Sequence, residues 1–166
     1  MEIKETEQKD IKDVVLIISQ AKHYFRENGI PQWQGDYPNE MDILKDIENY
    51  GAYCIKNDHE VVGYSFVAQY KDPNYSYIEG QWLNEEPYVV IHRTCIKDTM
   101  KGKNLASEFV VLAKTICEKN QIYNIRVDTH EKNISMQKML EKNGFIKTGI
   151  IYVEDGSPRF AYQLVL

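Results

Sequence analysis

A strand-loop-helix-strand pattern in the middle of the chain constrains the fold most. Residues 88–96 (YVVIHRTCI) are apolar on both alternating faces, as expected of a central strand that is covered on both sides. A loop containing glycine and lysine follows, and residues 122–127 resemble a further buried strand. Between them, apolar residues recur at helical spacing: Leu105, Phe109, Leu112, Ala113, Ile116 and Cys117. The pattern is typical of an α/β fold.

The rest of the chain continues this alternation. A long helix is expected to begin at Asp10 and end at Gly29, and a shorter one to occupy residues 40–50. A last helix is expected between a capping Asn133 and a terminating Gly144. The remaining expected strands are 2–6, 52–56, 61–70, 145–153 and 159–166, whereas residues 71–87 lack periodicity and are interpreted as an insertion loop. We therefore predict one domain spanning residues 1–166, with about seven strands and about four helices.

Composition limits the classes of function. A chain of 166 residues with 43% hydrophobic side chains suits one globular domain with a buried core. The net charge of -5 argues against a general nucleic-acid or membrane-surface binder, because either needs a basic face. The longest aliphatic run is Val14 to Ile18, and the first ten residues lack the apolar core of a signal peptide. We expect a cytoplasmic protein.

The cysteines and histidines do not form a metal or disulfide pattern. Cys54, Cys95 and Cys117 are odd in number, far apart and set in apolar surroundings, so they are predicted to be buried reduced thiols. The histidines lack ligand spacing with cysteines or carboxylates. No metal site is expected.

The loop after the central strand concentrates positive charge in an acidic protein. Its sequence, IKDTMKGKNLASEF over residues 96–109, contains three lysines and one glycine ahead of a helix. A helix N-terminus offers unpaired backbone N–H groups to an anion, and lysines add charge, so a phosphate would suit this place. The alternative is that the lysines are solvated and Gly102 is an ordinary turn glycine. The loop matches neither the Walker A pattern nor the dinucleotide-binding pattern, so nucleotide binding through the lysines is a third and weaker alternative.

The loop resembles the pyrophosphate loop of the GNAT superfamily of N-acetyltransferases. The family pattern is Gln/Arg-x-x-Gly-x-Gly/Ala after the central strand, and this chain has Lys101-Gly102-Lys103-Asn104-Leu105-Ala106. Lysine replaces the usual glutamine or arginine, and Asn104 stands at the usual first glycine. Lysine preserves the charge, and asparagine tolerates unusual backbone angles better than most residues.

A second segment is similar to the same family. GNAT proteins often have Asn-x-x-Ala-x-x-x-Tyr-x-x-x-Gly-Phe after the next strand, and residues 133–145 (NISMQKMLEKNGF) match its asparagine, glycine and phenylalanine. Met136 replaces the alanine, and Leu140 stands where many members have the tyrosine that protonates the coenzyme A thiolate. The resemblance spans essentially the whole chain. It implies a GNAT fold, with a mixed sheet whose central strands splay apart.

The resemblance also implies a cofactor site for acetyl-CoA. Backbone groups of Thr94, Cys95 and Ile96 would pair with the pantetheine arm. The pyrophosphate would lie over residues 101–106, and Asn133 would face the pantetheine. Leu140 is also assigned to the cofactor site, because it stands where many family members have the tyrosine.

Acetyl transfer to an amine needs a base, because an aliphatic amine is mostly protonated at neutral pH. His92 on the central strand, with Asp128 and His130 at the end of the next, are the candidates, each with a purely structural role as the alternative. Glu79 is a further candidate base. For the missing acid, Tyr88, Tyr152 and Tyr162 are candidates, or the thiolate leaves without one.

Aromatic side chains are candidates for the acceptor pocket. Trp33 and Tyr37 lie between the first two helices, and Trp82 lies just ahead of the central strand, although each ring could simply pack a loop. We therefore expect an acetyl-CoA-dependent N-acetyltransferase acting on a small primary amine or, as a lesser alternative, a peptide amine. The competing hypothesis is a GNAT-fold module that binds acyl-CoA without turnover. A homodimer is compatible with the family's exposed last strands.

Overall fold

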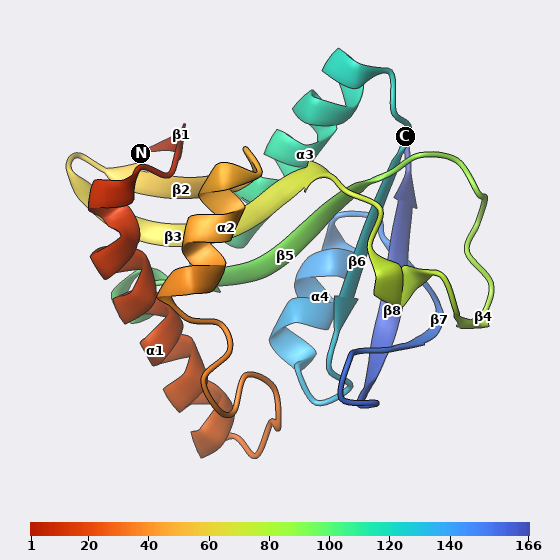
Figure 1. Ribbon diagram of the computed structural model, residues 1–166, viewed down its shortest axis with the longest axis horizontal. Coiled ribbons are helices and arrows are strands. Elements are labelled where there is room, and N and C mark those ends of the chain that lie inside the picture. Colours follow the sequence, from red (N-terminus) through yellow and green to blue (C-terminus); the bar gives the residue numbers. More distant parts are fainter. The chain divides into compact units, whose positions relative to one another are not determined.

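The structure is a computed structural model that describes all residues, 1–166. It has an α/β fold with a mixed sheet, and its elements are labelled in Figure 1. The helices are α1 (Ile11–Glu27), α2 (Glu40–Glu48), α3 (Ala106–Asn120) and α4 (Ile134–Lys142). The strands are β1 (Glu2–Glu5), β2 (Ala52–Asn57), β3 (Glu60–Gln69), β4 (Glu79–Gly80), β5 (Val89–Ile96), β6 (Asn124–Thr129), β7 (Ile146–Tyr152) and β8 (Pro158–Val165). Their order in the sheet is β1-β2-β3-β5-β6-β8-β7-β4.

The predicted elements are all present, and the structure adds an eighth strand. The additional strand is the short β4, which lies in the segment that we interpreted as a loop and pairs with β7. A Cβ at Gly80 would lie 2.4 Å from Thr148 O, and one at Gly149 would lie 2.1 Å from Glu79 O. Two facing glycines therefore permit this close backbone approach. A two-residue strand has no alternating pattern, so the sequence did not reveal it.

The chain forms two compact units. The first comprises Met1–Val67 and His92–Phe109, and the second comprises Ala68–Ile91 and Val110–Leu166. Strand β5 thus contributes its first three residues to the second unit and the others to the first.

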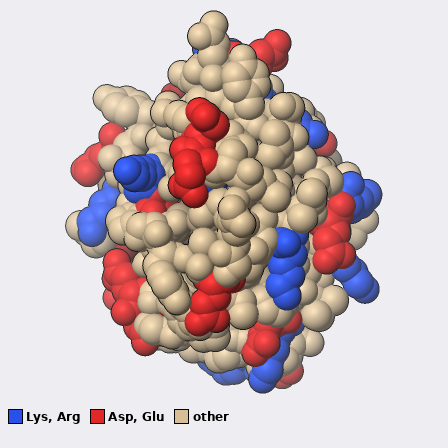
Figure 2. All heavy atoms as spheres, turned by 90° about the vertical axis from the view of Figure 1, so that its right-hand side faces the viewer, with Lys and Arg blue, Asp and Glu red and all other residues tan.

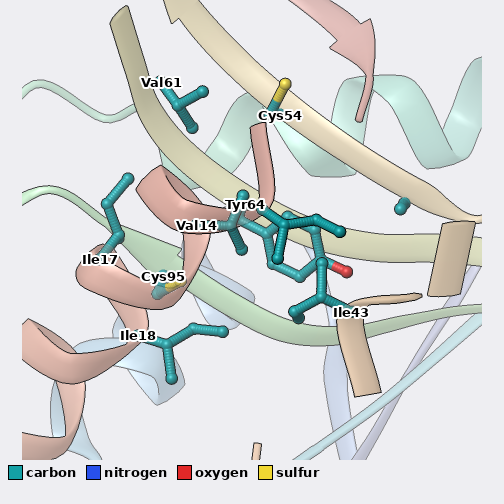
Figure 3. Packing of buried hydrophobic residues seen from close by; sticks show 10 residues of the cluster. Val14, Ile17, Ile18, Ile43, Cys54, Val61, Tyr64 and Cys95 are labelled. Atoms are coloured by element: carbon teal, nitrogen blue, oxygen red, sulfur yellow. The ribbon is translucent and has the colours of Figure 1, made fainter. Parts of the chain in front are cut away.

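In the first unit, strands β1, β2 and β3 are antiparallel, and side chains of β2, β3 and the end of β5 share a core with α1 and α2. Two capping boxes begin the segments that lead into these helices, one between Glu7 and Asp10 and one between Asn39 and Asp42. Figure 3 shows the buried side chains that meet between the helices and the strands. Those labelled there are Val14, Ile17, Ile18, Ile43, Cys54, Val61, Tyr64 and Cys95.

In the second unit, the start of β5 runs parallel to β6, and β6, β8 and β7 are antiparallel. Asn133 caps α4 by accepting a hydrogen bond from Met136 N (3.2 Å), and Gly144 follows the helix with φ 88°, which confirms both predictions. A buried amide network of Asn84, Asn124 and Gln163 attaches the 71–87 segment to β6 and β8.

The three cysteines are free and buried, as predicted. None of the helices is both long enough and apolar enough to cross a membrane. No group of three or more histidine, cysteine or carboxylate side chains could hold a metal ion. On the face drawn in Figure 2, basic side chains are interspersed with acidic ones and do not form a broad basic surface.

Candidate active site

The loop between β5 and α3 adopts a left-handed turn. Gly102 has φ 79° and Asn104 has φ 60°, so both lie in the region that most side chains avoid. Asn104 also accepts two hydrogen bonds from Ser107, one from the hydroxyl to its side-chain oxygen (2.9 Å) and one from the backbone N–H (3.2 Å). These contacts precede α3, and Asn104 adopts a left-handed conformation, which asparagine tolerates better than most residues.

The three lysines of this loop differ in whether an acidic side chain pairs with them. Lys97 pairs with Glu60, and Lys101 pairs with Asp98 at 2.7 Å. Lys101 also lies 4.4 Å from the centre of the Tyr24 ring. Lys103 lies outside any ion pair, with Nζ 3.5 Å from Met100 Sδ. Its charge is therefore the one that is least compensated beside the N-terminus of α3.

Residues 94–96 at the end of β5 are at least half-buried, and Thr94 has a side-chain partner. Thr94 Oγ1 lies 2.9 Å from Ser65 Oγ, and this fully buried serine also lies 3.1 Å from His92 O. Burial raises the pKa of Cys95 to about 12. The thiol therefore stays protonated at neutral pH, which argues against a nucleophilic cysteine. Ile96 is half-buried.

His92 and Arg93 lie against the same aromatic ring. The His92 imidazole is stacked on Phe66 with a centroid distance of 6.4 Å and an interplanar angle of 8°, and Arg93 Cζ lies 5.2 Å from the Phe66 centroid. Successive side chains of a regular strand point to opposite faces. Here Arg93 has φ 56°, so the alternation is broken and both side chains meet Phe66.

The guanidinium of Arg93 joins three segments of the first unit. Its Nε and Nη2 donate to the two carboxylate oxygens of Asp46 in α2, at 2.8 and 2.5 Å. Its Nη1 donates to Tyr37 Oη at 2.8 Å, and Tyr64 Oη donates to Asp46 at 2.6 Å. Burial alone would lower the pKa of Arg93, but contacts with Tyr37 and Asp46 raise it. Sequence reasoning missed this cluster, although an arginine within an otherwise apolar strand was a signal for it.

The candidate acceptor residues Trp33 and Tyr37 lie in the connector between α1 and α2, residues 28–39. Trp33 has φ 58°, and its ring meets Phe25 edge-on at 5.4 Å. Lys22 Nζ donates to Gly35 O at 3.0 Å, which ties the connector to α1. Tyr37 is 50% exposed.

The other predicted site residues belong to the second unit. Asp128 lies in β6, and His130 follows that strand. His130 Nδ1 accepts a hydrogen bond from Lys132 N at 3.0 Å, which assigns the proton of the neutral ring to Nε2. Burial, followed by the charge of Arg159, lowers the pKa of His130. The His130 nitrogen that has a lone pair, Nδ1, is therefore already engaged by the Lys132 N–H group.

Asn133, Leu140 and Trp82 are all buried. Leu140 is fully buried within α4, and Asn133 is the cap of the same helix. Trp82 Nε1 donates to Tyr75 O at 3.0 Å, and the Arg126 guanidinium lies 4.2 Å from the Trp82 ring. Trp82 thus packs the 71–87 segment in this structure.

The three candidate acids are also engaged or buried. Tyr88 Oη accepts a hydrogen bond from Asp72 N at 3.1 Å, and Tyr152 Oη donates to Glu79 at 2.8 Å. Tyr162 is 1% exposed, and burial raises its pKa. Glu79, the further candidate base, therefore already accepts an exposed hydrogen bond from Tyr152.

Comparisons with known proteins give one consistent result. The profile of the acetyltransferase (GNAT) family matches residues 18–145. No curated protein matches the chain. Among solved structures, the chain is similar to a GNAT family acetyltransferase from Streptococcus agalactiae, with 32% identity, a TM-score of 0.88 and coverage of 99% of this chain and 95% of that one.

Two more distant structures show the same fold. A GNAT family acetyltransferase from Listeria monocytogenes has 17% identity and a TM-score of 0.76, covering 99% of this chain and 94% of that one. A ribosomal-protein-alanine N-acetyltransferase from Brucella melitensis has 12% identity and a TM-score of 0.72, covering 100% of both chains. The family match covers most of the chain, and the Streptococcus agalactiae structure combines the same fold with 32% sequence identity, so the protein belongs to the GNAT family of acetyltransferases.

Proposed function

We propose that residues 1–166 act as one N-acetyltransferase domain that transfers an acetyl group from acetyl-CoA to a primary amine of a small molecule. The observation that supports this most is the left-handed loop of Gly102 and Asn104 at the start of α3. Backbone N–H groups at a helix N-terminus and the uncompensated charge of Lys103 suit a pyrophosphate. Residues 101–106 would hold it, and backbone groups of residues 94–96 would hold the pantetheine.

The proposed reaction is a direct transfer of the acetyl group from the thioester to the amine. Acetyl-CoA would supply the reactive thioester. The amine nitrogen would attack the thioester carbonyl carbon, so that a C–N bond forms as the C–S bond breaks; the coenzyme A thiolate would leave, and one proton would pass from the nitrogen to a base. We assign proton removal to His92, acting directly or through water, because the Nδ1 lone pair of His130 is used by Lys132 N. Asp128, Asn133, Trp33, Tyr37 and Trp82 remain proposed site residues.

The competing proposal is a coenzyme A-binding module without turnover. It is favoured by one observation, namely that Leu140 is fully buried at the position where many relatives have a proton-donating tyrosine. A thiol of ordinary pKa near 8.5 is a tolerable leaving group, so a missing acid slows transfer without abolishing it. We therefore expect turnover.

Calorimetric titration with acetyl-CoA tests the cofactor site, with NAD and ATP as controls. We compare Gly102→Val with Gly156→Val, a matched pair whose glycines have φ 79° and 82° and no atom within 4 Å of an added Cβ. Both substitutions strain a turn to a similar extent, but only Gly102 lies in the loop. Saturable binding of acetyl-CoA, weakened at least about tenfold by Gly102→Val alone, is expected. Equal weakening by both substitutions would contradict the proposed site.

Thiol release in the presence of a panel of polyamines, amino acids and aralkylamines tests turnover. We expect at least one amine to be acetylated, and His92→Gln to lower kcat about 100-fold or more while acetyl-CoA binding persists. Binding of acetyl-CoA without acetylation of any amine would instead support the module.

A further inference from the structure

Arg93 has a local conformation that a strand residue rarely adopts. Its φ of 56° departs from the extended backbone within the continuous strand β5, and an arginine has no intrinsic preference for this region. Left-handed residues other than glycine persist where surrounding contacts hold them. The contacts at Arg93 are unusually complete.

The guanidinium is fixed by two-pronged pairing. Arg93 Nε and Nη2 donate to both oxygens of Asp46, at 2.8 and 2.5 Å, and the side chains of this pair are 15% and 6% exposed. Tyr64 Oη donates to the same carboxylate at 2.6 Å from within the core. Planar two-pronged pairing specifies orientation as well as charge, which a lysine cannot reproduce. The remaining nitrogen, Nη1, is thereby aimed at one place.

That place is the connector of residues 28–39. Arg93 Nη1 donates to Tyr37 Oη at 2.8 Å, whereas the tethers at Lys22 and Gln34 attach the connector only to α1. The bond to Tyr37 thus links the connector to the residue beside His92. One guanidinium thus contacts both the Phe66 ring on which His92 stacks and the hydroxyl of Tyr37.

We propose that Arg93 is a positioning residue for the acceptor: its guanidinium, clamped by Asp46, holds Tyr37 and the connector in the acceptor-binding arrangement. Arg93 does not itself exchange a proton, because it is paired and permanently charged. The inference rests on the proposed acetyl transfer to an amine. It concerns acceptor recognition and is separate from acetyl-CoA binding by residues 101–106.

Hydrogen-deuterium exchange of the intact protein tests the clamp without any acceptor. Tyr37→Phe removes only the hydroxyl that accepts from Arg93, and Arg93→Lys keeps the charge but loses the two-pronged geometry. Tyr50→Phe is the matched control, because Tyr50 is 89% exposed. Amides of residues 30–39 are expected to exchange at least about threefold faster in Tyr37→Phe and Arg93→Lys than in the wild type or Tyr50→Phe. Unchanged exchange in both variants would overturn the clamp.

Steady-state kinetics with the best amine of the panel separate positioning from a merely structural role. We expect the KM for the amine to rise at least about fivefold in Tyr37→Phe, with the dissociation constant of acetyl-CoA within about twofold of the wild type. Faster exchange with an unchanged KM would overturn the acceptor role. If no amine is acetylated at all, the transfer proposal fails, whereas the exchange experiment still decides whether Arg93 clamps the connector.

Discussion

Gly51 offers a quantitative test of how the His92 region is packed. A Cβ added at this glycine would lie 2.2, 2.7 and 2.8 Å from three ring atoms of Phe66. Carbon atoms pack at about 3.5–4.0 Å, so the ring would have to move by more than about 1 Å. Phe66 is 5% exposed and contacts both His92 and Arg93, which leaves little room for that movement.

We expect Gly51→Ala to lower the free energy of unfolding by about 2 kcal/mol, within the usual range for overpacking a core. For a domain of this size the melting temperature would fall by about 4–8 °C. Gly51 does not have a left-handed φ, so alanine itself suits the backbone there and would even stabilise it by about 0.4–1 kcal/mol if the clash were absent. The sign of the effect therefore depends on Phe66.

A double-mutant cycle with Phe66→Leu measures this dependence. Urea denaturation of the four proteins gives the free energies of unfolding. In the Phe66→Leu background the smaller side chain makes room, and Gly51→Ala should be neutral or stabilising. The reasoning is refuted if Gly51→Ala destabilises both backgrounds equally, or if it costs the wild type less than about 0.5 kcal/mol.

Three further predictions follow from charges. Asp46→Ala leaves the Arg93 guanidinium buried without its carboxylate, so urea denaturation should show a loss of about 3–5 kcal/mol, and a loss below about 1 kcal/mol would contradict this pairing. Lys103→Gln should weaken acetyl-CoA binding several-fold at low salt and reduce its salt dependence, whereas Lys97→Gln, which removes a lysine already paired with Glu60, should change the affinity less than about twofold by calorimetry. Because burial holds the pKa of His130 below its ordinary 6.5, the unfolded chain binds the proton more readily, and the free energy of unfolding should fall as the pH drops from 6.5 through the folded pKa. His130→Asn should flatten that fall by up to about 1.4 kcal/mol per pH unit, and an identical pH profile would count against the assignment.

The regular elements could be predicted because their signals are local. The apolar run at 88–96, the cap at Asn133 and the terminating Gly144 each depend on neighbours within a few residues, and the structure confirms them. The sequence did not predict the left-handed turn at Asn104, although asparagine is one of the few residue types that tolerate that conformation. The eighth strand was missed, since its pairing depends on Gly149, which lies far along the chain.

The resemblance to the GNAT family, as read from the sequence, depended mainly on the spacing of two short segments. The loop of residues 101–106 and the segment of residues 133–145 are contiguous in sequence, so their similarity to the family survives without any knowledge of contacts. The proposed phosphate site also rests on local conformation, because a helix N-terminus presents unpaired backbone N–H groups.

Only the tertiary structure decided which side chains form ion pairs with one another and which pack against the same aromatic ring. Arg93 is 47 residues from Asp46 and 56 from Tyr37, and no periodicity connects them. The left-handed φ at Arg93 accompanies those distant contacts, and the side chains of His92 and Arg93 both lie against the Phe66 ring. Sequence therefore determined the elements and the loop that suits a phosphate, because local sterics and hydrogen bonds govern both. The packing of the whole first unit determined the environment of His92, because a buried ion pair forms only where folding brings its two partners together.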